Sequence, residues 1–196
     1  MVKQEERRAA TRRAVLGAAE TLFGRRGYAL TSVDDVAASA GVAKGAIYHH
    51  FRTKAELFEA VLDIVSARAV ADVMRATMLA TDFWSVVEIG NRAFFEACAD
   101  PVTSKIVLRD GPSVLGWAKW RAIDERNFGG LLRQVFATGI ENGMIAPQDP
   151  GKMAKVVLGA VTEAAIDAAQ SENYEESAAH YAKIISAMIS GWAVSV

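Results

Sequence analysis

Residues 31–51 constrain the fold of this chain more than any other stretch, because they hold a helix start, a helix stop and a second start in close succession. Thr31 or Ser32 can cap a first helix, since a hydroxyl accepts a hydrogen bond from an unpaired N–H of the first turn. Gly41 can end that helix, because a residue without a Cβ adopts the left-handed conformation at no steric cost. The pattern predicts two short helices joined by a tight glycine turn.

The second of these helices is expected to begin near Lys44. Ile47 and Phe51 repeat at helical spacing and are predicted to be buried. Lys44 and Tyr48 fall on another face, where polar and aromatic side chains can reach a DNA groove, as in a helix-turn-helix. Leu30, just before the motif, is expected to fill the core of a small three-helix head.

The stretch from residue 13 to residue 57 resembles the DNA-binding region of the TetR family of transcriptional regulators. Residues 16–58 read LGAAETLFGRRGYALTSVDDVAASAGVAKGAIYHHFRTKAELF. The resemblance covers about the first third of the chain. It is carried by an ordered series of features: Gly27-Tyr28, Thr31, an alanine-rich helix, Ala40-Gly41-Val42, Lys44-Gly45, Tyr48, Phe51 and Lys54.

The resemblance also implies which side chains meet DNA. Lysine can reach a guanine edge or a phosphate, and glycine allows close approach of the backbone. The chain departs from the family at Ala43 and Ala46, where Ser and Thr are frequent, so two hydroxyl contacts are missing. The expected partner is double-stranded DNA with a palindromic operator. The implied DNA-binding residues are Thr31 or Ser32, Lys44, Gly45, Tyr48, His49, His50 and Lys54.

Charge is divided unevenly along the chain, although the net charge is only -1. Residues 1–55 carry ten Lys and Arg against five Asp and Glu, a net of +5, so the remainder carries -6. A basic head on an acidic body suits a protein of which only the head approaches a polyanion. The pairs Arg7-Arg8 and Arg12-Arg13 stand in a segment with little to bury, which can contact phosphates or stay disordered.

Beyond the head the chain shows no strand-like alternation, so the body is predicted to be helical throughout. A long helix over residues 54–79 is expected to lead from head to body. A turn is predicted at residues 110–112, followed by a helix over residues 113–141. The expected fold is all-α with about nine helices: a helix-turn-helix DNA-binding domain at residues 1–54 and a ligand-binding and dimerisation domain at residues 55–196.

The last two helices, about residues 149–171 and 174–194, hold more apolar and small residues than one buried face requires. Small residues let helices approach closely, and apolar surface on two faces needs a second partner. A symmetric four-helix interface would supply that partner, and the resemblance implies the same homodimer. The alternative is that both faces are buried within one subunit.

Aromatic residues gather in the middle of the body, where family members generally bind inducers. A pocket lined by them would accept a hydrophobic or aromatic small molecule, although aromatics at helical spacing are also ordinary core residues. Cys98, the only cysteine, allows no intrachain disulfide and is either a buried thiol or a pocket or redox-sensing residue. The candidates for a ligand site are Trp84, Phe94, Cys98, Trp117, Trp120 and Phe128.

Enzymatic functions lack their usual residues in this sequence. His49 and His50 diverge around a helix and His180 is distant in sequence, so no metal site is expected. No P-loop, dinucleotide fingerprint or nucleophile elbow is present, and no cofactor is expected. No apolar run reaches the roughly 18 residues that cross a bilayer, so a cytoplasmic protein without a membrane partner is expected.

The motif and the resemblance together predict a DNA-binding transcriptional regulator. The favoured form is a repressor that a hydrophobic or aromatic small molecule releases from its operator. The alternative is a DNA-binding protein without an inducer, whose body serves only dimerisation or protein partners. A solid core without a cavity would favour this alternative.

Overall fold

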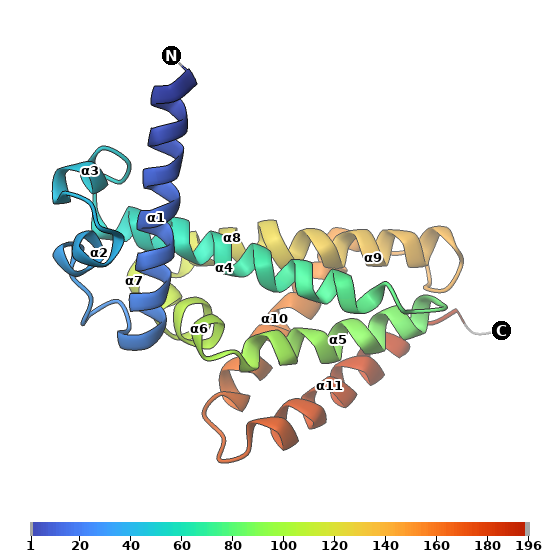
Figure 1. Ribbon diagram of the computed structural model, residues 1–196. Coiled ribbons are helices and arrows are strands. Elements are labelled where there is room, and N and C mark those ends of the chain that lie inside the picture. The colour runs from blue at the N-terminus through green and yellow to red at the C-terminus, as the bar shows by residue number, and fades with distance from the viewer. Residues whose placement is uncertain (1, 195–196) are drawn as a thin grey trace. The chain divides into compact units, whose positions relative to one another are not determined.

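The computed structural model of the chain describes residues 2–194 (Figure 1). Within this range nine continuous helical stretches occur and no strand, apart from one isolated bridge between Ile145 and Ala193. The predicted all-α fold is therefore confirmed. The chain forms two compact units, one of residues up to 65 with 101–118, and one of residues 66–100 with 119 onward.

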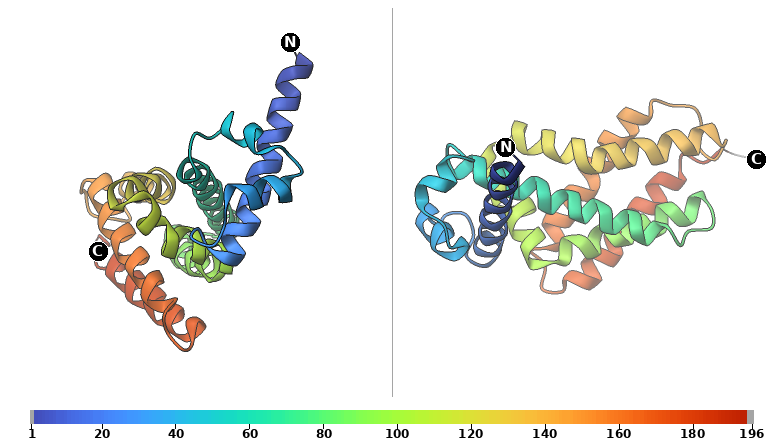
Figure 2. Two further views of the ribbon diagram at one scale, coloured as in Figure 1. Left: turned by 90° about the vertical axis from the view of Figure 1, so that its left-hand side faces the viewer. Right: turned by 45° about the horizontal axis from the view of Figure 1, so that its top comes forward.

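The first unit is built around the long helix α1, which packs on α2, α3 and the helical stretch after residue 100. Its first turns project beyond α2 and α3 (Figures 1 and 2). The arginine-rich N-terminal segment is thus a continuation of α1. The helices of this unit are α1 (Val2–Arg26), α2 (Val33–Ala40), α3 (Lys44–Tyr48), the first part of α4 (Lys54–Thr77), α6 (Pro101–Thr103), the π-helical η1 (Ser104–Asp110) and α7 (Gly111–Leu115).

The core of the first unit includes residues that sequence reasoning placed in the body. Gly24 of α1 approaches Val102 so closely that a Cβ on Gly24 would lie 2.9 Å from the Val102 Cγ2 atom. Beyond the end of α1, the Tyr28 N–H donates a hydrogen bond of 2.7 Å to the Asp110 Oδ2 atom. Residues 101–115 are therefore part of the compact unit that holds the helix-turn-helix, whereas the predicted domain boundary lay at residue 54.

Residues 110–112 form no turn, contrary to the prediction. The stretch from α6 through α7 is continuous helix, and the chain turns instead at Gly116. Pro112 is the second residue of α7, directly after the π-helical η1, and the helix continues through it. The helix predicted to start at residue 113 accordingly begins with α8 at Trp117.

An aromatic cluster fills the first unit. The Phe58 ring packs edge-on against both Phe23 and Tyr28, with 5.2 Å between ring centroids in each pair. Phe23 and Phe58 are fully buried. The prediction that Leu30 fills this core is wrong, because Leu30 is 76% exposed and the Tyr28 ring occupies the space beside Phe58.

The second unit is a bundle in which α5 lies along α11, and α10 packs on both α9 and α11 (Figure 2). The start of α5 is capped, since the Asp82 carboxylate accepts a hydrogen bond of 3.0 Å from the Ser85 N–H. The helices of this unit are the last part of α4, α5 (Phe83–Ala99), α8 (Trp117–Asp124, from residue 119), the π-helical η2 (Glu125–Gly129), α9 (Gly130–Glu141), α10 (Pro150–Ala168) and α11 (Tyr174–Ser190).

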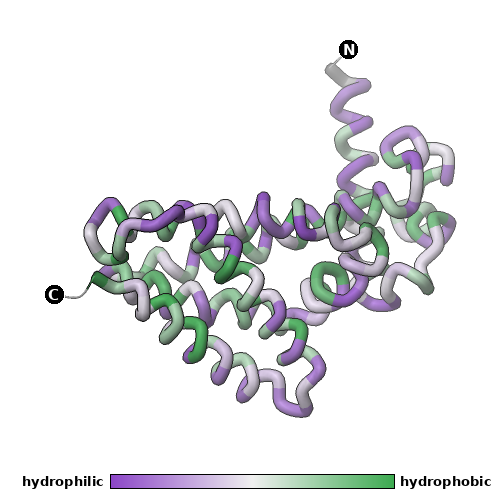
Figure 3. The backbone as a smooth tube through the Cα atoms, turned by 180° about the vertical axis from the view of Figure 1, so that it is seen from behind, coloured by the Kyte–Doolittle hydropathy of each residue, from purple (hydrophilic) through white to green (hydrophobic). Residues whose placement is uncertain are grey.

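Hydrophilic residues interrupt the hydrophobic ones along the helices (Figure 3). Among the helices that the structure describes, none is both long and apolar enough to cross a membrane.

Candidate nucleic-acid interface and body cavity

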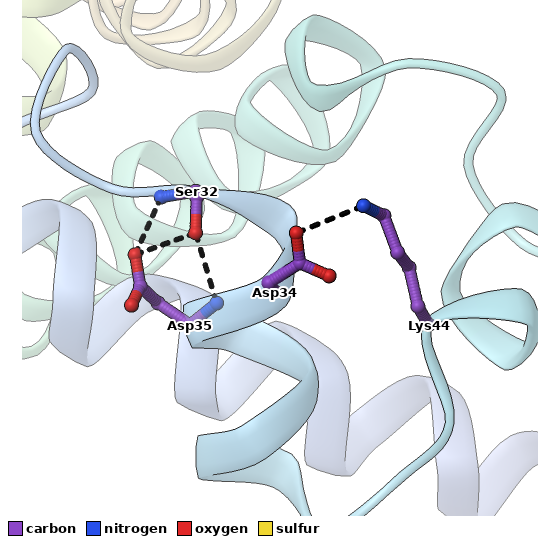
Figure 4. Close-up of polar contacts among 4 residues, drawn as sticks. All are labelled: Ser32, Asp34, Asp35 and Lys44. Carbon is purple, nitrogen blue, oxygen red and sulfur yellow. Dashed lines mark hydrogen bonds and ion pairs between the residues drawn. The ribbon is translucent and has the colours of Figure 1, made fainter.

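The start of α2 is fixed by a reciprocal cap between Ser32 and Asp35 (Figure 4). The Ser32 Oγ atom accepts a hydrogen bond of 3.0 Å from the Asp35 N–H. The Asp35 carboxylate in turn accepts one of 2.8 Å from the Ser32 N–H. Hydrogen bonds from Ser32 lower the pKa of Asp35, so this carboxylate stays ionised at the positive end of the helix. Ser32 itself is exposed, so the cap lies on the surface of the head.

Thr31, the other candidate for the cap, has a different position. It is buried, and its hydroxyl donates a hydrogen bond of 2.9 Å to the Gly27 carbonyl. The side chain therefore joins the end of α1 to the start of the motif. The Ser32 hydroxyl therefore lies at an exposed residue, whereas the Thr31 hydroxyl lies at a buried one.

The turn between α2 and α3 has the predicted glycine geometry. Gly41 has φ 66°, and its N–H donates to carbonyls at the end of α2. The following Val42 N–H donates a bond of 3.0 Å to the Ala37 carbonyl. Ile47 of α3 is buried, which directs the opposite side of α3 outward. The helix-turn-helix inferred from the sequence is present in the structure.

Lys44, the first residue of α3, is paired within the chain. Its Nζ atom lies 2.8 Å from the Asp34 Oδ2 atom of α2, and both side chains are exposed (Figure 4). The hydrogen bond and charge of Asp34 raise the pKa of Lys44. A DNA group that binds Lys44 must therefore compete with a carboxylate. This pair was not predicted from the sequence, because two residues ten positions apart across a turn leave no local signal.

The remaining outward residues of α3 are open to a partner. Tyr48 is 46% exposed, and His49, which follows it, is exposed as well. A Cβ added to Gly45 would meet no atom of the chain within 4 Å, and Gly45 does not have a positive φ. Nothing in the fold therefore requires glycine at this position, and the exposed backbone of Gly45 carries no side chain that would hinder a close approach.

Gly45→Ala is expected to separate DNA binding from stability. The free energy of unfolding should stay unchanged or rise by up to roughly 1 kcal/mol, because alanine favours helix over glycine. Affinity for operator DNA should fall about fivefold or more, the size of one base contact, because the methyl group would hold the backbone away. Urea unfolding and fluorescence anisotropy measure the two quantities. Equal DNA affinity in the variant and the wild type would contradict a close contact at Gly45.

Lys54 stands at the start of α4 and is held by an aromatic ring. Its Nζ atom lies 3.9 Å from the centroid of the Tyr28 ring, and burial lowers the pKa of Lys54. The turn before it is capped, since the Thr53 hydroxyl accepts a bond of 3.1 Å from the Glu56 N–H. The Glu56 carboxylate accepts from the Arg52 N–H at 2.7 Å. The cation at this helix start is thus positioned before any partner binds.

The predicted ligand residues are only partly brought together. The rings of Phe94 and Phe128 meet edge-on with centroids 5.1 Å apart, and both line one cavity in the second unit. Trp120 is buried but does not line this cavity, and Trp84 does not line it either. Trp117 is 65% exposed and belongs to the first unit.

Cys98 is a free, buried thiol outside the cavity lining. Burial, followed by the charge of Asp124, raises the pKa of Cys98 to about 12. A thiol in this state has little thiolate character at neutral pH, and the thiolate is the reactive form. The structure thus favours the buried-thiol interpretation over a redox sensor.

The cavity measures about 70 Å³ and no charged side chain lines it. Sequence reasoning missed most of its lining, because aliphatic residues at helical spacing look the same whether they face a cavity or a packed neighbour. Among the described residues no group of three or more His, Cys, Asp or Glu could hold a metal ion. The lining residues are Val73, Thr77, Val86, Val87, Gly90, Asn91, Phe94, Phe128, Leu131, Leu132, Val135, Phe136, Val157, Val161 and Ile189.

Comparison with known proteins gives matches over both parts of the chain. Residues 15–61 match the family model described as bacterial regulatory proteins, tetR family. Residues 84–192 match the model described as tetracyclin repressor-like, C-terminal domain. The transposon Tn10 TetC protein of Escherichia coli is 25% identical over 165 residues, which cover 84% of this chain and 83% of TetC.

Solved structures show the same fold over nearly the whole length. A TetR-family transcriptional regulator from Pectobacterium atrosepticum has a TM-score of 0.84 at 30% identity, over 100% of this chain and 98% of that chain. RolR in complex with its ligand resorcinol has a TM-score of 0.76, over 94% of this chain and 90% of RolR. The identity to RolR is 17%, so this second likeness concerns the fold alone.

Proposed function

The chain belongs to the TetR family of bacterial transcriptional regulators, and we propose that it is a repressor released from its operator by a small, uncharged, largely apolar molecule. As a member of this family it is a DNA-binding regulator and not an enzyme. The observation that carries the ligand part of the proposal is the cavity in the second unit. A regulator that binds bacterial DNA is also proposed to act in the cytoplasm.

A homodimer through α10 and α11 is part of the proposal. Val156 of α10 is 58% exposed and Ile184 of α11 is 50% exposed, which leaves apolar surface on both helices. Most small residues of α10 are nevertheless buried within the chain, among them Ala165 and Ala168. Internal packing thus accounts for one face of α10, and a second copy would cover the other. Two heads related by two-fold symmetry would then match a palindromic operator.

The cavity lining indicates the chemistry of the ligand. An ionised ligand would lose its hydration without gaining a charged partner, which is costly in an apolar site. The polar groups at the wall come from Thr77 and Asn91. The Asn91 amide donates to Ser186 Oγ and the Ala182 carbonyl, and its side-chain oxygen accepts no bond from the described residues. A neutral ligand with one hydroxyl or N–H donor suits this wall, and the structural neighbour RolR binds resorcinol.

The size of the cavity supports a change of state on binding. Its volume of about 70 Å³ is less than half of the roughly 150 Å³ that hold a benzene molecule in an engineered protein cavity. Entry of an aromatic ring therefore requires side chains or helices around the cavity to move apart. A ligand that binds the expanded state better than the present one would shift the population towards it. If DNA binds only the present state, the ligand weakens DNA binding.

Gly90→Ala tests the cavity directly. A Cβ on Gly90 would meet the nearest atom, Thr77 Cγ2, at an ordinary 3.4 Å, so the methyl group fits while it narrows the cavity. DNA affinity without ligand should stay unchanged, whereas release by neutral phenols should need about fivefold more ligand, since one methylene in an apolar pocket is worth about 1–3 kcal/mol. Gly130→Ala of α9 is the matched control, because a Cβ there meets no atom within 4 Å.

The operator for this measurement comes from footprinting of genomic fragments with the purified protein. Neutral phenols should release the DNA, and carboxylates of the same size should not. Compounds that change tryptophan fluorescence but never DNA affinity would contradict the coupling. That result would favour a regulator without an inducer. The small volume of the cavity, about 70 Å³, is consistent with this alternative as well.

A further inference from the structure

A second basic surface lies on the first unit, beside the recognition helix. Arg8 and Arg12 of α1 and His50, two residues after α3, line one open depression together with Glu5 and Ala9. The two arginines are four residues apart and therefore project from the same side of α1. This part of α1 projects beyond α2 and α3 (Figures 1 and 2) and is largely hydrophilic (Figure 3).

The buried ring of Phe51 positions two of these side chains. The Arg12 guanidinium carbon lies 5.6 Å from the centroid of the Phe51 ring. The His50 ring centroid lies 6.2 Å from the same ring. Phe51 belongs to the core, with 5% of its surface exposed. The depression is thus built on the core of the head and does not consist of free arginine side chains alone.

Positive charge outweighs negative charge on this surface, because Glu5 is the one carboxylate beside two arginines among the described residues that line the depression. Unlike Lys44, neither Arg8 nor Arg12 forms an ion pair with a carboxylate among the described residues. Burial lowers the pKa of His50, and the charges of Arg8, Arg12 and His49 lower it further. The imidazole therefore senses a positive potential that a bound anion would relieve.

We propose that Arg8, Arg12 and His50 bind a phosphate of the DNA backbone and so extend the contact of the head from α3 onto α1. Guanidinium groups match the geometry of phosphate oxygens, and an imidazole can donate an N–H bond to the same group. The contact would hold the head in register and carry no sequence information. This proposal rests on DNA binding by α3. His50 follows the end of α3 by two residues, so the two contacts would be adjacent along the chain.

The test compares two double variants that remove the same charge from α1. Arg8→Gln/Arg12→Gln changes the arginines at the depression, and Arg7→Gln/Arg13→Gln changes two exposed arginines that do not line it. Binding to a random-sequence duplex is measured by fluorescence anisotropy between 50 and 200 mM salt. The first variant should bind about fivefold or more weakly, and its salt slope should fall by about 0.9 for each phosphate that the protein no longer neutralises. The second should change both quantities much less.

Arg8→Gln alone provides a variant that leaves the Phe51 contact intact, with Arg7→Gln as its control. Equal affinities and equal salt slopes for the single and double pairs would overturn the site. A wild-type protein that binds no duplex would contradict DNA binding itself, which is a different failure.

A titration with inorganic phosphate at constant ionic strength distinguishes binding of the DNA backbone from binding of a free anion. The His50 ring resonances should shift with the duplex. A shift with inorganic phosphate and none with the duplex would overturn the assignment to DNA.

Discussion

Lys44→Ala and Tyr48→Ala should each weaken operator binding roughly tenfold or more, with little change in the free energy of unfolding. Both side chains are exposed on the outward side of α3, so neither contributes to the core of the head. Lys44 can reach a guanine edge or a phosphate, and Tyr48 offers a ring to a thymine methyl and a hydroxyl to a phosphate. Anisotropy titration with operator DNA and thermal unfolding measure the two effects.

The Asp34 carboxylate sharpens this expectation. In Lys44→Ala the carboxylate remains at the surface without its partner at 2.8 Å, and it would repel the DNA backbone. Asp34→Asn should instead bind DNA more tightly than the wild type, because Lys44 can then bind a DNA group without giving up an ion pair with residue 34. In the double variant Lys44→Ala/Asp34→Asn, part of the lost affinity should return.

Arg75→Ala is the control for lost charge. Arg75 is an exposed cation of α4 that pairs with Asp72 at 2.7 Å, as Lys44 pairs with Asp34, but it belongs to the second unit. This variant should leave operator affinity nearly unchanged. Unaltered affinity in both Lys44→Ala and Tyr48→Ala would exclude α3 as the DNA-reading helix.

Phe58→Ala should destabilise the first unit by about 3–5 kcal/mol and abolish DNA binding as a consequence. Phe58 is fully buried and packs edge-on against Phe23 and Tyr28. Its removal leaves a cavity between α1 and α4 and withdraws support from the Tyr28 ring, on which Lys54 rests. Urea unfolding followed by circular dichroism measures the loss.

Leu30→Ala is the matched control for Phe58→Ala. It removes an apolar side chain from the same unit, but Leu30 is 76% exposed, so the expected change is within about 0.5 kcal/mol. A loss in Leu30→Ala as large as that in Phe58→Ala would show that the core of the head is packed differently.

Much of the head could be predicted from its sequence because its signals are local. The Ser32 cap, the left-handed Gly41 and the buried Ile47 depend on residues within about four positions of one another. The exposed positions of Lys44 and Tyr48 follow from the same helical spacing. The prediction for Leu30 was wrong because an apolar residue just outside a helix has no periodic neighbours that assign it to a face.

The candidate ligand site was less predictable. Phe94 and Trp120 are both buried aromatics of the second unit, yet Phe94 lines the cavity and Trp120 does not. Residue type and spacing report burial but not the shape of the space next to a side chain. Asn91, which lines the cavity, is held by hydrogen bonds from α5 to α11, and these join residues about ninety positions apart.

The sequence by itself determined the helical class, the helix-turn-helix and the basic head, because hydrophobic period, capping and charge act over a few residues. Only the tertiary structure decided that residues 101–115 belong with that head. The bond from the Tyr28 N–H to Asp110 spans 82 positions, and the close approach of Gly24 to Val102 is equally remote in sequence. The same holds for the grouping of Arg8 and Arg12 with His50. Contacts of this kind depend on where the packed helices bring the chain back together, and no local pattern records that.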